Sequence, residues 1–141
     1  MLVTVSPRMV SVVFRHAEEA YPAEACGFLV GEWSGENAQV DEATPAQNAG
    51  VYSSQAFEID AQHYMNVVES LRGTGRQIVG FYHSHPGQPD VPSQEDWGSA
   101  QNWPDMLWMI VRVEAGQALS QQTYFLPQGK QAFEKAEVHL S

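Results

Sequence analysis

The stretch that decides the fold covers residues 77–96 and reads QIVGFYHSHPGQPDVPSQED. Residues 77–84 have an apolar and aromatic centre, which is typical of a buried strand. The prolines and the glycine of residues 85–92 favour a loop, because proline lacks a backbone N–H and its φ is fixed. Ser93 is a good N-cap, so a helix is expected to begin directly after it. The segment therefore predicts a central strand, a loop and a helix start.

The rest of the chain predicts further strands and two longer amphipathic helices. Strands are expected where apolar or alternating runs are bounded by turn residues, at 2–5, 25–33, 37–47, 57–59, 106–113 and 118–126. Helices are expected where apolar residues recur at helical spacing, at 7–20 and 61–72, with a short terminal helix at 129–138. Strands and helices alternate without a regular βαβ rhythm. We therefore predict an α+β (mixed α/β) fold with a mixed central sheet flanked by helices.

Length and composition indicate one domain with an acidic surface. A chain of 141 residues with 43% hydrophobic residues can bury one core, so residues 1–141 are expected to form a single domain, with a core at about 2–126 and a short C-terminal tail. The formal net charge is −10, from 7 basic and 17 acidic residues. Nucleic acids and anionic membranes require a basic face, so neither is expected as a partner.

Cysteine usage and the N-terminal residues favour a cytoplasmic protein. Cys26 is the only cysteine, which excludes an internal disulfide and a thiolate-rich metal cluster. Residues 1–22 lack the basic region, apolar core and small-residue cleavage site of a signal peptide. The longest apolar runs are far shorter than the roughly 20 residues that span a bilayer.

Three residues of the deciding segment have side chains suited to a metal. Side chains two apart in a strand share a face, so His83 and His85 are expected to point the same way. The loop then returns the chain to the helix start, where Asp96 follows Ser93 by three residues. Two imidazoles and one carboxylate are typical of catalytic zinc sites, which keep a fourth position for water.

Each part of this arrangement also has an ordinary structural explanation. His-x-His pairs are common without any metal, and Ser93 with Asp96 forms a regular helix N-terminus in which Asp96 would only stabilise the helix. The complete spacing H-x-H-P-x₆-S-x₂-D, with every member present, favours the metal site.

The complete pattern resembles that of the JAMM metallopeptidases, also called MPN-plus domains, in their small stand-alone prokaryotic form. Their motif has an upstream glutamate, then H-[ST]-H-P, six residues, serine, two residues and aspartate. Here the histidine part is residues 83–86, and the upstream glutamate is Glu24 in the string PAEACGFLVG, residues 22–31. The resemblance extends over roughly residues 2–126 and implies an MPN-like domain.

The resemblance implies a role for each matched residue. His83, His85 and Asp96 would bind one Zn²⁺ per chain, Glu24 would be the general base, and Ser93 would donate to the oxyanion. Strand 25–33 must then run beside strand 77–84, to bring Glu24 to the metal. Cys26, two residues from Glu24, is interpreted as a small buried hydrophobe, with a thiol near the zinc as the alternative.

The function implied is that of a zinc-dependent peptidase or isopeptidase. It would hydrolyse an amide bond at the C-terminal tail of a ubiquitin-like or sulfur-carrier protein. The chain shows no long insertion between its core elements, so selectivity among polyubiquitin linkages is not expected. Two alternatives stay open: a metal-free MPN-type scaffold that only binds partners, and a zinc hydrolase of small amides.

Overall fold

The computed structural model describes residues 1–47 and 59–141, and these contain one mixed sheet and three helices. The helices are α1 (Pro7–Ala20), α2 (Ala61–Leu71) and α3 (Gln94–Ala100). The strands are β1 (Leu2–Val5), β2 (Cys26–Ser34), β3 (Asn37–Ala46), β4 (Gln77–Pro86), β5 (Leu107–Glu114), β6 (Gln117–Phe125), β7 (Glu134–Lys135) and β8 (Glu137–Leu140). The predicted α+β fold is confirmed.

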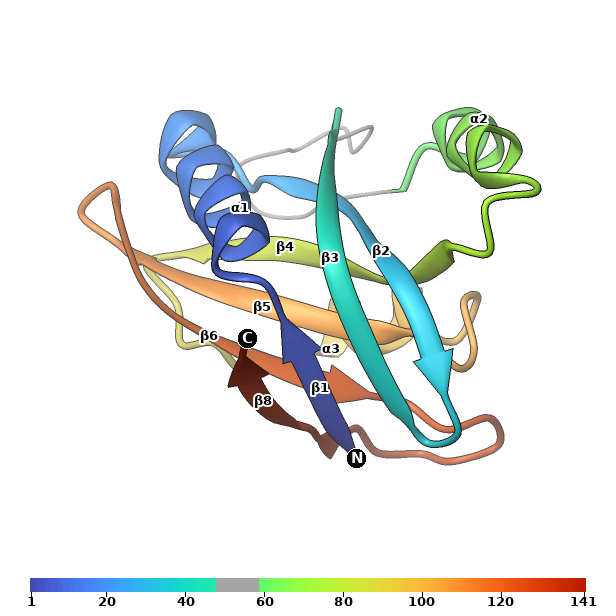
Figure 1. Ribbon diagram of the computed structural model, residues 1–141. Coiled ribbons are helices and arrows are strands. Elements are labelled where there is room, and N and C mark those ends of the chain that lie inside the picture. The colour runs from blue at the N-terminus through green and yellow to red at the C-terminus, as the bar shows by residue number, and fades with distance from the viewer. Residues whose placement is uncertain (48–58) are drawn as a thin grey trace.

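The strand order in the sheet is β7-β6-β5-β4-β2-β3-β1-β8, with β4 at the centre. Strand β4 pairs antiparallel with β2 and parallel with β5. Strands β7 and β8 lie at opposite ends of this order, although only Ala136 separates them in the chain. The two ends of the sheet therefore curl towards each other, and Figure 1 shows β8 beside β1 near the N-terminus.

Helix α1 covers one face of the sheet. Ser6 caps it by accepting a hydrogen bond from the Met9 N–H at 3.1 Å, and Pro7 begins it. Met9, Val13 and Ala17 recur every four residues and are buried, which places one stripe of the helix on the sheet. Helices α1 and α3 lie on opposite sides of the central strands (Figure 1). The predicted helix 7–20 is confirmed.

A second core lies on the other face of the sheet, beneath α2. Asp60 caps this helix through the N–H groups of Gln62 and His63, as expected from the sequence. The helix buries no residue completely, and Tyr64 packs at its inner side against Phe28 and Phe81. The aromatic residues of this core pack on one face of the strand that leads to the two histidines.

A β-bulge in β4 decides which side chains face each core. Leu29 on β2 pairs with Gly80 while Val30 pairs with Ile78, so Val79 is an extra residue on β4. Val79 and Tyr82 lie in the core beneath α1, whereas Ile78 and Phe81 lie in the core beneath α2. After the bulge the strand alternates regularly, which puts positions 81, 83 and 85 on the α2 side.

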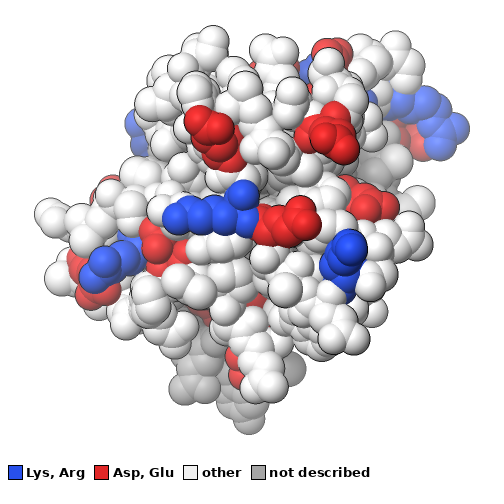
Figure 2. Space-filling view, turned by 90° about the horizontal axis from the view of Figure 1, so that it is seen from below, with Lys and Arg blue, Asp and Glu red and all other residues white. Residues whose placement is uncertain are grey.

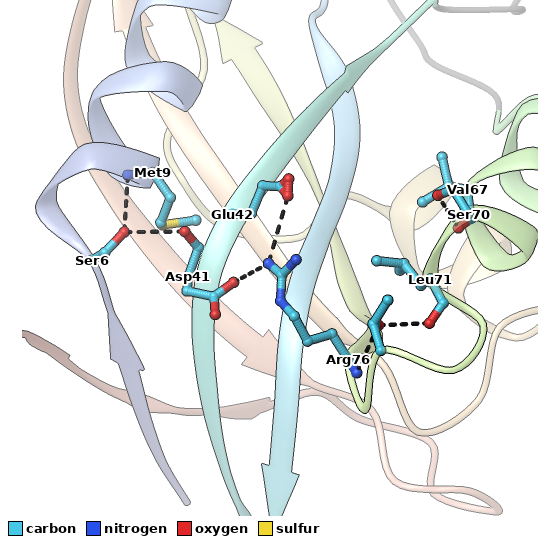
Figure 3. Close-up of polar contacts among 9 residues, drawn as sticks. Ser6, Met9, Asp41, Glu42, Val67, Ser70, Leu71 and Arg76 are labelled. Carbon is cyan, nitrogen blue, oxygen red and sulfur yellow. Dashed lines mark hydrogen bonds and ion pairs between the residues drawn. The ribbon is translucent and has the colours of Figure 1, made fainter.

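Ion pairs tie the start of β4 to the neighbouring hairpin. The Arg76 guanidinium bonds to the Asp41 carboxylate and lies 3.5 Å from the Glu42 carboxylate, as Figure 3 shows. The Ser6 hydroxyl donates to the carbonyl of the same Asp41 at 3.4 Å. Acidic and basic side chains are interspersed on the face seen from below (Figure 2). That face therefore offers no continuous basic surface to a polyanion.

Two expectations about secondary structure differ from the fold. The expected helix at 129–138 is wrong, because residues 134–135 pair with β6 and residues 137–140 pair with β1. The expected loop at 85–92 begins later, because His85 and Pro86 still pair with β5. Most of the strand expected at 57–59 lies outside the described residues. Among the described helices, none has the length and hydrophobicity needed to span a bilayer.

Two glycines provide a matched test of backbone packing. A Cβ at Gly31 would overlap the backbone carbonyl of Gln39, which is fixed by strand pairing, so Gly31→Ala is expected to destabilise the fold by about 1–3 kcal/mol. A Cβ at Gly98, in α3, would meet nothing within 4 Å. Gly98→Ala should therefore stabilise the fold by about 0.5–1 kcal/mol. Urea unfolding midpoints measure both, and equal shifts of the same sign would contradict this packing.

Candidate metal centre

Two histidines and one aspartate converge where β4 ends and α3 begins. The Nε2 atoms of His83 and His85 lie 3.1 Å apart. One carboxylate oxygen of Asp96 lies 3.0 Å from His83 Nε2, and the other lies 3.0 Å from His85 Nε2. The three side chains are 0%, 3% and 5% exposed, respectively. The structure therefore brings the three predicted ligands into one buried cluster.

The spacing of these atoms fits a zinc ion. Zinc binds imidazole nitrogen and carboxylate oxygen at about 2.0–2.2 Å, and tetrahedral geometry then separates neighbouring ligand atoms by about 3.3–3.6 Å. The separations of 3.0–3.1 Å between the three residues are slightly below that value. To hold a zinc ion, the three ligand atoms would therefore need to move only slightly apart. Two neutral imidazoles and one carboxylate are also the donor set that zinc accepts.

Asp96 is held in place by the helix cap. Its backbone N–H donates to Ser93 Oγ at 3.0 Å, and the Ser93 N–H donates to Asp96 Oδ2 at 2.8 Å. Burial by itself raises the pKa of Asp96, but His83, His85 and the Ser93 N–H together hold that pKa well below its ordinary value. The two explanations of Asp96 are therefore compatible: the hydrogen bonds of the capping box hold its carboxylate in the position from which it would bind the metal.

A backbone carbonyl orients His85. Its Nδ1 lies 2.8 Å from the Pro89 oxygen, which can only accept a hydrogen bond, so Nδ1 carries the proton and Nε2 is left for a metal. Burial lowers the pKa of His85, but Asp96, the Pro89 carbonyl and Glu24 outweigh it and raise that pKa overall. Complete burial lowers the pKa of His83 and favours its neutral form, which is the one that binds metals.

Glu24 lies at the same centre, just before β2. It is 7% exposed, and ligand atoms of Glu24, His83 and His85 lie within 4.8 Å of one another. Asp96 contacts both imidazoles more closely, which leaves Glu24 as the second carboxylate of the site. Burial raises the pKa of Glu24 to about 7; the charge of His85 opposes this rise, and the charges of Asp96 and Glu95 add to it. A carboxyl group with that pKa exchanges protons readily near neutral pH.

Strand register explains how Glu24 reaches the histidines. Cys26 pairs with His83, which confirms that the strand at 25–33 runs beside the one at 77–84. Beyond this pair, Ser84 accepts a hydrogen bond from the Ala25 N–H through Oγ at 2.8 Å and donates its own N–H to the Ala25 carbonyl at 3.0 Å. Sequence reasoning missed the roles of Ser84, which bonds to the backbone of Ala25, and of Pro89, whose carbonyl orients His85. Neither residue type indicates in advance which partner it will bond to.

Cys26 packs as a small apolar side chain in the core beneath α2. It is 3% exposed, and its neighbours include Phe28 and Phe81. Burial, followed by the charge of Glu24, raises the pKa of the thiol to about 12. We expect the native thiol to react with a disulfide reagent at least about 100-fold more slowly than in the urea-unfolded chain, because only the thiolate reacts. Stopped-flow absorbance measures this, and equal rates would show that the thiol is exposed.

The tryptophans near the site divide into core and surface. Trp108 is 1% exposed, and Trp103 packs against Tyr64 and Phe81 at ring-centre distances of 4.6 and 5.3 Å. Trp97 follows Asp96 on α3, is 37% exposed, and donates its indole N–H to the Gln131 carbonyl at 2.9 Å. Trp97 is therefore an exposed aromatic side chain that directly follows a member of the cluster in the chain.

Comparisons with known proteins identify the family of this chain. The family model for prokaryotic homologs of the JAB domain matches residues 6–124. A desampylase from Haloferax volcanii is 34% identical over 102 residues, which are 70% of this chain and 71% of that protein. A probable TtuB-protein conjugate cleaving protease from Thermus thermophilus is 26% identical over 102 residues, and the match spans 72% of this chain and 64% of that protein.

A solved structure supports the same assignment. The solution structure of a Desulfitobacterium hafniense protein superposes with a TM-score of 0.86 at 26% identity, and the match covers 99% of this chain and 92% of that one. The family model covers most of the chain, including β4 and α3, which carry the buried cluster. The chain belongs to the JAMM family, among the prokaryotic homologs of the JAB domain, and is a JAMM-type hydrolase.

Proposed function

We propose that this hydrolase is a zinc-dependent isopeptidase acting at the C-terminal tail of a ubiquitin-like or sulfur-carrier protein. One observation carries the proposal: Asp96 lies 3.0 Å from both histidine Nε2 atoms, and a second buried carboxylate, Glu24, lies at the same centre. A metal-binding set beside a separate proton-accepting group is the combination that metal-assisted hydrolysis of an amide by water uses.

Each residue of the site has a separate role in the proposed hydrolysis. His83, His85 and Asp96 would hold zinc, which when bound acts as a Lewis acid and lowers the pKa of water to about 7. Glu24 takes a proton from the attacking water and passes it to the nitrogen of the leaving amine. The new bond joins the water oxygen to the carbonyl carbon, and the C–N bond breaks. Ser93 Oγ accepts from the Asp96 N–H, so its hydroxyl hydrogen can be donated to the oxyanion.

The burial of the site limits the shape of its substrate. The four acidic and imidazole side chains are between 0% and 7% exposed, so only a narrow, extended chain can present its carbonyl there. The C-terminal tail of a carrier protein has that form, and the Thermus thermophilus relative is named for cleaving TtuB–protein conjugates. We place this activity in the cytoplasm, where a single unpaired cysteine is stable.

A defined conjugate tests the proposal. A ubiquitin-like carrier is joined through its C-terminal carboxylate to a lysine ε-amine of a second protein, and the zinc-loaded chain is added. Mass spectrometry should detect the carrier with a free C-terminal carboxylate. Hydrolysis of small acyl-amino acids without cleavage of the conjugate would instead favour a small-amide hydrolase. Binding of the conjugate with no cleavage of either substrate would favour a scaffold.

A further inference from the structure

The loop between His85 and α3 supplies no side-chain ligand, yet it fixes the orientation of one. The Pro89 carbonyl lies 2.8 Å from His85 Nδ1, so the position of this oxygen determines both the tautomer and the ring angle of His85. The loop is also bonded next to the histidine, where the Gly87 N–H donates to the Val113 carbonyl of β5 at 2.8 Å. The Gln88 N–H donates to the His85 carbonyl at 3.3 Å, so these two bonds hold the backbone up to Gln88. The position of the Pro89 carbonyl then also depends on the contacts of the next residue, Asp90.

Asp90, the residue after Pro89, is bonded twice to strand β6. Ser120 Oγ donates to its carboxylate at 2.7 Å, and the Tyr124 hydroxyl donates to its backbone carbonyl at 3.0 Å. Positions 120 and 124 share a face of the strand by alternation, so both side chains reach the same loop residue. All three residues are half-buried. Because β6 pairs with both β5 and β7, its backbone is a fixed support.

The Tyr124 hydroxyl can keep its hydrogen bond to the Asp90 carbonyl over a wide pH range. Its burial and the neighbouring Asp90 raise the pKa of the phenol above its ordinary value, so it stays protonated and remains a donor near neutral pH. Its ring also contacts Phe133 edge-on, with ring centres 6.1 Å apart, which restricts its movement.

We propose that Asp90, Ser120 and Tyr124 form a clamp that positions His85 for metal binding and so sets the zinc affinity of the site. The clamp acts through the Pro89 carbonyl and touches neither metal nor substrate, so its members are positioning residues. The inference rests on the zinc site of the proposed function. Without the clamp, the loop has to be ordered when the metal binds, and loss of such outer hydrogen bonds typically weakens metal binding 10–100-fold.

The test compares zinc affinity among variants, measured by competition with a chromophoric chelator. The double variant Ser120→Ala/Tyr124→Phe is expected to bind zinc about 10–100-fold more weakly than the wild type. Asp90→Ala removes the carboxylate bond alone and should have a smaller effect. Asp90→Asn keeps an oxygen that accepts from Ser120, so it should restore near wild-type affinity. Leu119→Ala, on the same strand and 54% exposed in the wild type, is the matched control.

Two further readouts separate positioning from general destabilisation. The melting temperatures of the zinc-free variants should stay close to that of the zinc-free wild type, although the affinities differ. The absorption spectrum of the Co²⁺-loaded double variant should differ from that of the wild type, because the angle of one imidazole ligand changes. A zinc affinity of the double variant within about twofold of the wild type would overturn the clamp while leaving the zinc site intact. A wild type that binds no zinc would overturn the proposed function itself.

Discussion

Glu24→Gln is expected to lower kcat for conjugate cleavage by about 10²–10⁴-fold while leaving zinc content unchanged. Glutamine has nearly the same shape as glutamate and fills the same buried position, but it cannot take a proton from water. The two histidines and Asp96 contact each other directly, so the metal site does not depend on this change. Steady-state kinetics on the conjugate, with zinc quantified in the same samples, measure both quantities.

Glu95→Gln is the matched control for this substitution. Glu95 is an exposed carboxylate in the first turn of α3, and its charge is among those that raise the pKa of Glu24. Its removal should change kcat by no more than about twofold, since an exposed charge is screened by solvent. A Glu24→Gln variant that retains more than about a tenth of wild-type activity would remove Glu24 from the proton transfer.

Asp96→Ala is expected to abolish both zinc binding and activity. Asp96 contacts both imidazoles, so its removal takes away a ligand and leaves two buried histidines without their carboxylate. Loss of a direct ligand should weaken zinc binding by more than the 10–100-fold typical of outer contacts. Without the metal, water keeps its ordinary pKa and cleavage should fall below detection. Chelator competition and the conjugate assay measure the two effects.

Ser93→Ala separates the capping role from the ligand role. It removes the hydroxyl that accepts from the Asp96 N–H but keeps the Ser93 N–H that bonds to the carboxylate. Zinc should stay bound, stability should fall by about 1 kcal/mol, and kcat should fall by about 10²–10³-fold if the hydroxyl stabilises the oxyanion. An Asp96→Ala variant that still binds zinc as tightly as Ser93→Ala would exclude Asp96 as a ligand.

The local part of the fold could be predicted because it follows from neighbouring residues. The helix at 7–20 depends on Ser6, Pro7 and a regular apolar stripe, all of which are visible in the sequence. The shared direction of His83 and His85 depends only on strand alternation. The position of Glu24 came from the family resemblance, because the register between β2 and β4 that brings it to the site has no local signal.

The remaining features depend on contacts between distant segments. Residues 137–140 form a strand because they pair with β1, at the other end of the chain. This long-range pairing outweighs the local helix preference on which the expected helix is based. The bulge at Val79 shifts the alternation of β4 through its pairing with β2, which composition does not reveal. The contact between His85 and the Pro89 carbonyl depends on how the loop is anchored to β6.

Metal content tests the central claim most directly. Wild type and His85→Ala are loaded with zinc, desalted and examined by elemental analysis. We predict about one zinc per wild-type chain and almost none in the variant, because Nε2 of His85 lies 3.0–3.1 Å from the ligand atoms proposed for His83 and Asp96. The metal-binding group found among the described residues holds no third imidazole that could replace it. Wild type without zinc, or a variant that retains it, would contradict the metal site on which this account rests.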